Sequence, residues 1–398
     1  MLENDDKKYV LNTYAKNYTN FIKGKNARLF DENNKEYIDF TSGIGVLSLG
    51  HANEQITKTI CEQASKILHI SNLYVIEPQV KLAKKIVELS PFEDGGVFFA
   101  NSGAEANEGA IKLARKYGEI KKAKSKENKP FKIISLKNSF HGRTIATAKA
   151  TAQNSIHPLS FAPYPEGFIY VETLEDIYKN IDDKTLGVMI ELIQGEGGVL
   201  TFPKEEIQKL ASYLKEKGVL LIVDEVQTGV FRTGDFLCSQ MYGICPDIVT
   251  LAKGLGGGVP IGAVLTSHKD IFTAGDHGST FGGNYLVTAT SLEVLKILKD
   301  LKDSGVLENK IKYFHQKLEN TLKQFPKIFS KIQGLGLMKG LSLKEAEQLK
   351  KLIGLCLDEG LLVLKAGKNT LRFLPALSIS TEEIDLGFQR LETALKKL

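Results

Sequence analysis

The sequence predicts an α/β protein in which a large domain contains a mostly parallel, seven-stranded sheet, accompanied by a smaller α+β unit. Three observations support this fold class. Seven short apolar runs recur through the middle of the chain, helical patterns lie between several of them, and the pattern changes after about residue 285. Alternation of strands and helices is typical of a parallel sheet that is covered on both faces.

The seven apolar runs are the expected strands of the large sheet. Each is four or five residues long, and the runs are rich in valine and isoleucine, which is typical of strands buried on both faces. They are Val97–Ala100, Ile133–Leu136, Phe168–Val171, Val188–Leu192, Val219–Val223, Ile248–Leu251 and Ile261–Leu265.

Helical spacing between the runs supports the same fold. Ala106, Ala110, Leu113, Ala114 and Tyr117 fall on one face of a helix, which small apolar residues would allow to pack closely on the sheet. A helix between strands is the crossover that parallel strands require.

The end of the chain predicts a smaller unit. An amphipathic helix is expected over residues 307–322, because apolar residues recur there at helical spacing with charges on the far face. Leu361–Leu364 and Leu371–Leu374 read as short strands before a last helix. The first 50 residues, with the hairpin-like Arg28–Asp31 and Lys35–Phe40, are expected to pack with this unit.

The length of 398 residues exceeds what one hydrophobic core usually holds, so more than one domain is expected. The predicted division is an N-terminal segment 1–50, a large domain 51–284 and a C-terminal small domain 285–398.

Charge gives no sign of a nucleic-acid partner. There are 52 Lys and Arg residues against 47 Asp and Glu residues, a net charge of +5. The densest basic run, Lys121–Lys129, contains no aromatic residue and is expected to be a solvated loop.

Other patterns argue against a membrane or a metal. The N-terminus is acidic and lacks the apolar core of a signal peptide, and no apolar run reaches the roughly 18 residues of a membrane helix. The four cysteines are scattered without a CxxC pair, and no HExxH motif occurs. We therefore expect a cytoplasmic protein without a disulfide framework or a bound metal.

Polar residues gather where the predicted strands end, which is the edge where ligands bind in open α/β sheets. The first group, Asn101–Glu105, leads into a helix. Gly103 and Ala104 would present free backbone N–H groups to a phosphate, and the Ser102 hydroxyl could add a bond. A plain helix cap is the alternative.

Two further strand ends carry Asp224 and Lys253. An acid at a buried strand end needs a cationic or hydrogen-bonding partner. Lys253 precedes a glycine-rich turn that matches neither GxxxxGK nor GxGxxG, so nucleotide binding is not indicated. Lysine becomes a nucleophile when its pKa is depressed or when an aldehyde traps it. A surface lysine and a capping acid are the alternatives.

The strand ending at Leu136 is followed by Phe140 and Arg143. The ring suits stacking, and the guanidinium suits a carboxylate. Either could be an ordinary loop residue.

Taken together, the phosphate cradle, stacking aromatic, strand-end aspartate and lysine resemble, in order and spacing, the class III aminotransferases. These are pyridoxal-phosphate enzymes of fold type I. The resemblance runs from about Tyr14 to the last helix. It is supported by Glu36–Phe40, Ser42–Ile44, Gln194–Gly198, His277–Thr280 and Leu371–Phe373.

The resemblance implies roles for the cofactor residues. Lys253 would hold pyridoxal phosphate as an imine, and Asp224 would pair with the pyridine N–H. Gln227 would bind the ring hydroxyl, and Phe140 and Val226 would sandwich the ring. Gly103, Ala104 and Ser102 would bind the phosphate. Thr280 would reach the phosphate across a homodimer interface, so that the two subunits share their active sites.

It also implies the substrate contacts. Arg143 would hold the carboxylate remote from the reacting amine, and Arg372 the 2-carboxylate of glutamate or 2-oxoglutarate. Glu196 would neutralise Arg372 when the donor presents a terminal amine. Tyr14 and Ser279 are placed with the substrate contacts.

The implied reaction transfers the 5-amino group of N2-acetylornithine to 2-oxoglutarate in arginine biosynthesis, giving N-acetylglutamate 5-semialdehyde and glutamate. Phe140–Arg143 resembles the form that uses acetylornithine, because ornithine enzymes tend to have tryptophan where His141 stands. Leu192 departs from the proline usual in the family, which affects the expected geometry around Glu196.

Several alternatives remain open. Succinylornithine, succinyl-diaminopimelate, ornithine or 4-aminobutyrate could be the donor. A mutase or racemase could use the same scaffold, although Arg372 and Glu196 favour a transaminase. A non-catalytic binding protein is the remaining alternative, against which the presence of Lys253 and Asp224 argues.

Overall fold

The computed structural model describes residues 2–122 and 129–398, so most of the basic run Lys121–Lys129 lies outside the described residues. The described helices have the following bounds: α1 Leu2–Tyr9, α2 Ser42–Gly45, α3 Glu54–Ala64, α4 Glu77–Leu89, α5 Gly103–Tyr117, α6 Ile145–Ala150, α7 Leu174–Asn180, α8 Lys204–Lys217, α9 Cys238–Tyr242, α10 Tyr285–Asp303, α11 Val306–Gln324, α12 Ala346–Asp358 and α13 Thr381–Lys396. Short π or 3₁₀ turns are η1 Gly118–Lys122, η2 Leu159–Phe161 and η3 Lys253–Leu255.

The strands form one large sheet and three smaller ones. Their bounds are β1 Phe21–Lys25, β2 Arg28–Asp31, β3 Glu36–Asp39, β4 Gly96–Ala100, β5 Lys132–Leu136, β6 Phe168–Val171, β7 Thr185–Ile190, β8 Ile193–Gln194, β9 Leu200–Thr201, β10 Leu220–Asp224, β11 Ile248–Leu251, β12 Gly262–Thr266, β13 Phe329–Gln333, β14 Lys339–Leu343, β15 Leu361–Leu362, β16 Leu364–Ala366 and β17 Thr370–Phe373.

The large sheet confirms the predicted fold class. It has seven strands in the order β4-β12-β11-β10-β7-β5-β6, and each of the seven apolar runs contributes one of them. Only β12 runs against its neighbours β11 and β4. The sheet is therefore mostly parallel, and the carboxyl ends of β4, β5, β7, β10 and β11 meet along one edge.

Both faces of this sheet are buried. In β10, Leu220 and Ile222 pack in the cluster that includes the apolar face of α5, whereas Leu221 and Val223 pack in the cluster that includes α7 and α8. Successive side chains of a strand point to opposite faces, so a strand covered on both sides has to be continuously apolar. This explains why the runs in the sequence are mostly apolar on both alternating sets of positions.

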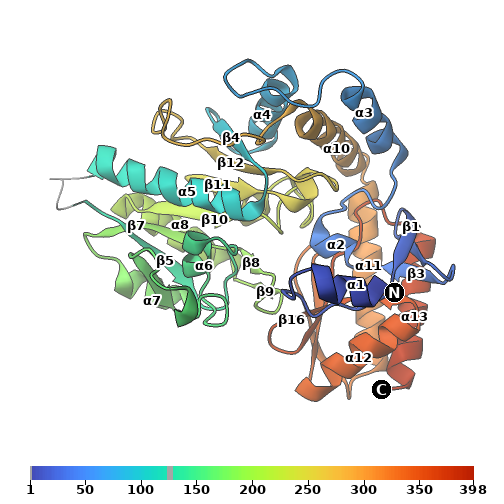
Figure 1. Cartoon of the computed structure of the whole chain (residues 1–398). Coiled ribbons are helices and arrows are strands. Elements are labelled where there is room, and N and C mark those ends of the chain that lie inside the picture. Colours follow the sequence, from blue (N-terminus) through green and yellow to red (C-terminus); the bar gives the residue numbers. More distant parts are fainter. Residues whose placement is uncertain (1, 123–128) are drawn as a thin grey trace.

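The last quarter of the chain forms a four-stranded sheet, β13-β14-β17-β16, with α11, α12 and α13. Figure 1 shows this part, coloured orange to red, beside the blue N-terminal strands. The run Leu361–Leu364 is divided between two sheets, because β15 pairs with β3 in parallel and β16 pairs with β17. The division into three segments remains a prediction. Helix α10, which follows the predicted boundary at residue 285, packs against α3 and α4.

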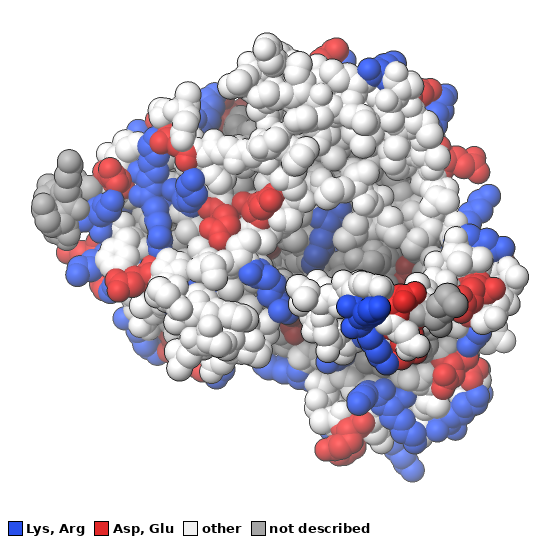
Figure 2. Space-filling view, in the orientation of Figure 1, with Lys and Arg blue, Asp and Glu red and all other residues white. Residues whose placement is uncertain are grey.

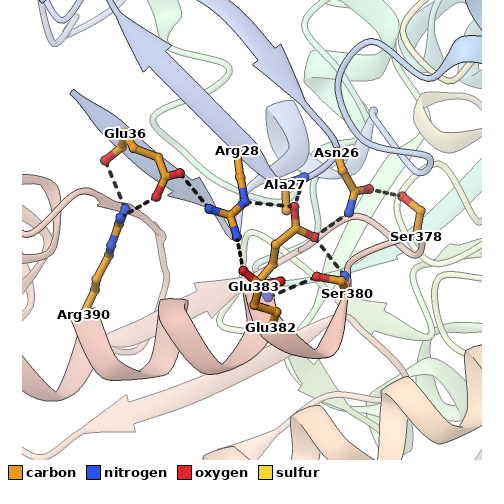
Figure 3. A network of polar contacts seen from close by, with 9 residues as sticks. All are labelled: Asn26, Ala27, Arg28, Glu36, Ser378, Ser380, Glu382, Glu383 and Arg390. Atoms are coloured by element: carbon orange, nitrogen blue, oxygen red, sulfur yellow. Dashed lines mark hydrogen bonds and ion pairs between the residues drawn. The ribbon is translucent and has the colours of Figure 1, made fainter. Parts of the chain in front are cut away.

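A polar network ties the N-terminal strands to the last helix (Figure 3). Arg28 donates to Glu36 at 2.7 Å and to Glu382 at 2.9 Å, and Arg390 donates to Glu36 at 2.8 Å. Glu383 accepts hydrogen bonds from Asn26 and from the backbone N–H of Ala27. Residues 26–36 are thereby joined to α13 by hydrogen bonds, several of them charge-assisted.

The described surface mixes charges of both signs. Figure 2 shows basic and acidic side chains interspersed on one face, which is hollowed near its middle. Among the described residues, no helix is long and apolar enough to cross a membrane, and no cluster of His, Cys, Asp and Glu could hold a metal ion.

Candidate active site

A cavity of about 480 Å³ lies at the carboxyl edge of the large sheet. It is lined by residues that follow β4, β5, β7, β10 and β11, as the parallel arrangement requires. Ten residues predicted from the sequence line it together: Ser102, Gly103, Ala104, Phe140, Arg143, Glu196, Asp224, Val226, Gln227 and Lys253.

The N-terminus of α5 forms one wall of the cavity. The Ser102 side chain caps the helix by accepting a hydrogen bond from the Glu105 N–H at 3.1 Å. The N–H groups of Gly103 and Ala104, which precede Glu105 in the first turn, have no intrahelical partner. A side chain at position 103 would lie 2.7 Å from Val226, so only glycine lets the helix end approach this closely. The result is a backbone seat for an anion.

Asp224 ends β10 and is buried with three hydrogen bonds. Its Oδ2 accepts from Asn107 Nδ2 at 2.8 Å and lies 2.8 Å from His141 Nδ1, and its Oδ1 accepts from the Val226 N–H at 3.0 Å. Thr250 in turn donates to Asn107 Oδ1 at 2.7 Å. The carboxylate is therefore fixed in orientation from three elements.

Lys253 follows β11 and is held with a φ of +40°, a region that residues with side chains rarely adopt. Its ammonium lines the cavity, and within the described residues it makes no hydrogen bond or ion pair. Burial, followed by the neighbouring Arg372 cation, lowers the pKa of Lys253 below its usual value. A lysine with a lowered pKa is more readily present as the neutral amine, which can act as a nucleophile or a base.

Arg372 in β17 does not itself line the cavity, but it is hydrogen-bonded to two residues that do. Its Nη1 donates to Glu196 Oε1 at 2.6 Å and to Gln227 Oε1 at 3.3 Å. The Nε atom is buried and has no hydrogen-bond partner among the described residues. This arginine thus retains hydrogen-bonding capacity for a further anion.

Arg143 lines the cavity directly. Its guanidinium is 5.6 Å from the centre of the Phe140 ring, and the residue is exposed. The loop that carries it is held by Glu108, which accepts from the Thr144 hydroxyl at 2.5 Å and from the Ala146 N–H at 3.2 Å. The cavity therefore has one exposed arginine in its lining, and a second, buried arginine lies behind Glu196 and Gln227.

Besides Arg372, three predicted residues do not line this cavity. Ser279 and Thr280 line a separate pocket on the far side of Asn101, and Asn101 borders both. Its Nδ2 donates to the Ser279 hydroxyl at 3.0 Å. Tyr14 is 75% exposed and lines neither pocket. In the single chain, these three side chains are not brought to the cavity.

The sequence analysis missed Glu191, His141 and Asn107 as parts of the site. Glu191 directly follows β7, so the strand-end rule would have found it, had the apolar run been ended at Ile190. His141 stands inside the motif that was used for Phe140 and Arg143. Asn107 carries no sequence signal, because it is an ordinary polar residue on the buried face of α5.

Comparisons with known proteins point to one family. The family model described as "Aminotransferase class-III" matches residues 10–395. A curated acetylornithine aminotransferase from Wolinella succinogenes is 54% identical over 391 residues, which is 98% of each chain. A succinylornithine transaminase from Photorhabdus laumondii is 45% identical and covers 94% of this chain and 93% of its own.

The solved structures agree. The ornithine aminotransferase from Toxoplasma gondii, crystallised with PLP at partial occupancy, superposes with a TM-score of 0.90 at 31% identity. The match covers 99% of this chain and 93% of that one.

Proposed function

Because this chain belongs to the class-III aminotransferases, which are pyridoxal-phosphate enzymes, we propose that it transfers the 5-amino group of N2-acetylornithine to 2-oxoglutarate. The products are N-acetylglutamate 5-semialdehyde and glutamate, as a step of arginine biosynthesis. The observation that carries the donor assignment is the pairing of Arg372 with Glu196, together with an exposed Arg143 in the lining of the same cavity as Glu196 and Lys253.

The residues of the cavity fit pyridoxal phosphate. The free N–H groups at the start of α5 suit its phosphate, and Asp224 suits a protonated ring nitrogen. The unpaired, buried amine of Lys253 suits its aldehyde. When bound, the cofactor withdraws electrons from the amine-bearing carbon of the substrate.

The protein's own groups perform the remaining work. Lys253 takes and returns the proton at the amine-bearing carbon, a role for which its lowered pKa is suited. Asp224 keeps its orientation through Asn107 and His141. Phe140 and Val226 would confine the cofactor ring between them, and Gln227 would bind its hydroxyl.

Substrate choice follows from the two arginines. N2-acetylornithine has one carboxylate, remote from the reacting amine, and Arg143 binds it. Glu196 meanwhile neutralises Arg372, since nothing charged lies beside a terminal amine. 2-Oxoglutarate has two carboxylates, so it also needs Arg372, and its 2-carboxylate takes the place of Glu196.

The test is the visible absorbance of the cofactor in the purified holoenzyme, titrated first with N2-acetylornithine and then with 2-oxoglutarate. We expect the band to disappear with the donor and to return with the oxo acid, and Lys253→Ala to lack the starting band. A band that responds to N2-succinylornithine or ornithine but not to N2-acetylornithine would overturn the donor assignment and leave the cofactor assignment standing.

We also propose that the enzyme works as a homodimer with shared active sites. Thr280 lies outside its own chain's cavity, and the exposed apolar residues Leu73, Val75 and Phe281 surround the loop that bears it. Asn72 fastens this surface by donating to the backbone oxygens of Ser279 and Gly282. A second copy covering the surface would bring Thr280 to the partner's phosphate.

Mixing inactive variants tests the shared site. Lys253→Ala and Thr280→Ala subunits, unfolded and refolded together, should recover activity, because one site of each mixed dimer has both residues intact. No recovery in dimers shown by mass to be mixed would contradict the proposal.

We further propose a reducing, cytoplasmic setting, which suits four unpaired cysteines.

A further inference from the structure

Glu191 is a buried acid that lines the active-site cavity and has no part in the scheme above. It directly follows β7, which lies between β10 and β5 in the sheet. Its Oε1 accepts a hydrogen bond from the Phe140 N–H at 2.8 Å, and its Oε2 accepts one from the Gly195 N–H at 3.2 Å. One carboxylate therefore joins the backbones of two different loops.

These two loops carry Arg143 and Glu196, the residues that are proposed to select the substrate. Phe140 lies three residues before Arg143, and Gly195 immediately precedes Glu196. The loops also lie against each other, because Gln194 Nε2 donates to the Lys137 backbone oxygen at 2.9 Å. Glu191 lines the cavity, whereas Gln194 and Lys137 do not.

The second loop also leads to Arg372. The Gly367 N–H, in the turn between β16 and β17, donates to the Glu196 backbone oxygen at 2.8 Å. A side chain at position 195 would collide with Gln227, which itself accepts a hydrogen bond from Arg372. A shift of Gly195 would therefore be transmitted to both partners of Arg372.

Placing an acid here is costly. Burial raises the pKa of Glu191 to about 7, and the nearby Asp224 acts in the same direction. His141 and the two backbone N–H groups act in the opposite direction, and Lys253 also feels the charge of Glu191. An apolar residue would avoid this cost, but it would leave two buried N–H groups without an acceptor.

We propose that Glu191 is a positioning residue for substrate selection, whose two carboxyl oxygens hold the Arg143 loop and the Glu196 loop at a fixed separation. Neither oxygen has to touch the substrate for this. The kinetic part of the inference rests on the proposed transaminase function, whereas the structural part does not.

The chain offers a matched control in Glu225. It is also buried, and it accepts hydrogen bonds from two backbone N–H groups, those of Cys238 and Ser239, at 2.6 and 2.8 Å. Glu225 does not line the cavity. Glu191→Gln and Glu225→Gln thus remove the same kind of contact, one between the substrate loops and one away from them.

The first measurement is hydrogen–deuterium exchange of the holoenzymes, followed by mass spectrometry. In Glu191→Gln, which keeps one acceptor oxygen but adds a donor, we expect faster exchange in the peptides covering both 138–144 and 194–198. In Glu225→Gln we expect faster exchange around 238–239 and none in the two substrate loops. Unchanged exchange in either substrate loop of Glu191→Gln would overturn the proposal.

The second measurement separates KM from kcat with pyridoxal phosphate in excess. Loss of the hydrogen bonds that Glu191 accepts from the two loops should raise KM about tenfold for N2-acetylornithine and for 2-oxoglutarate. This is the loss in affinity expected from weakening a charged hydrogen bond. The value of kcat should stay within about threefold, because among the described hydrogen bonds Glu191 makes none to Lys253 or Asp224, and Asp224 is held by Asn107, His141 and the Val226 N–H. Glu191→Asp, which keeps the charge, should restore part of the loss.

The outcomes are distinguishable from a failure of the proposed function. If wild-type enzyme does not use N2-acetylornithine, the proposed donor is wrong, and the exchange experiment alone decides the role of Glu191. If both loops exchange faster while both KM values match those of the wild type, the selection role is wrong. If Glu191→Gln does not fold, the same two measurements on Glu191→Asp decide, with the same signs and smaller changes.

Discussion

The Arg372 guanidinium lies 2.6 Å from the Glu196 carboxylate, with 3% of the arginine side chain exposed but 33% of the glutamate side chain. The two side chains therefore differ in how much room they have to move. Glu196 borders solvent, whereas Arg372 is enclosed and also bound to Gln227. When a substrate carboxylate competes for this arginine, Glu196 is the partner with room to leave.

Removing that competitor should favour glutamate over the terminal-amine donor. In Glu196→Ala, we expect the KM for glutamate to fall about tenfold, because its 2-carboxylate no longer displaces an ion pair. The kcat/KM for N2-acetylornithine should fall, since Arg372 is then left as an unpaired buried charge while this donor is bound. Single half-reactions with each substrate, followed by cofactor absorbance, measure both effects. Equal changes for the two substrates would contradict the switch.

Arg143 should matter only for substrates with a remote carboxylate. Arg143→Ala is expected to raise the KM for N2-acetylornithine and 2-oxoglutarate by about tenfold or more, because one charged, two-pronged contact is lost. A terminal amine of similar length without a carboxylate serves as the control, and its slow turnover should be unchanged. A loss for that amine as large as for N2-acetylornithine would place Arg143 in a general structural role.

The capture of the cofactor by Lys253 should depend on pH through Arg372. The pKa of Lys253 is lowered first by burial and then by Arg372. In Arg372→Met the second cause is gone, so the pKa rises toward its usual 10.5 and less neutral amine is present at a given pH. Stopped-flow binding of pyridoxal phosphate to cofactor-free enzyme should show its rate rising at higher pH than in the wild type.

Arg143→Met is the control for this experiment. Arg143 is not among the causes of the lowered pKa of Lys253, so its profile should coincide with that of the wild type. A profile of Arg372→Met that stays in place or moves to lower pH would show that Arg372 does not act on Lys253.

Two helical glycines should respond to alanine in opposite ways. In α13, a side chain at Gly387 would collide with the Phe40 ring, whereas the surroundings of Gly354 in α12 are open. Gly387→Ala is expected to destabilise the fold by about 1–3 kcal/mol through overpacking. Gly354→Ala should stabilise it by about 0.5–1 kcal/mol through helix propensity. Denaturant unfolding monitored by circular dichroism compares the two, and shifts of the same sign would contradict this account.

The apolar runs predicted the large sheet well, because a strand buried on both faces is visible in the sequence as consecutive, mostly apolar residues. Those runs carry no direction, so the reversed strand β12 could not be predicted from them. The same limit applies to Leu361–Leu364, which looks like one strand but is shared between β15 and β16. Which sheet a short run joins depends on partners far away in the sequence.

The site was predictable where polar residues follow strands, as for Asp224 and Lys253. Glu191 was missed because it was counted inside the apolar run Val188–Leu192. The strand itself ends at Ile190, one residue before Glu191. The hydrogen bond from Asn107 to Asp224 joins two positions that only the fold brings together. Thr280 is a different case, since no feature of a single chain can show a contact that a second chain would complete.

The pairing of Ile38 with Leu361 has a consequence for how the protein is made. All seven strands of the large sheet are synthesised before β15, so that sheet can form while the free edge of β3 still waits for its partner. An unpaired strand edge is a template for joining other chains. The interval of greatest aggregation risk therefore comes late in translation, between completion of the large sheet and the emergence of β15, and it ends only when the last quarter of the chain leaves the ribosome.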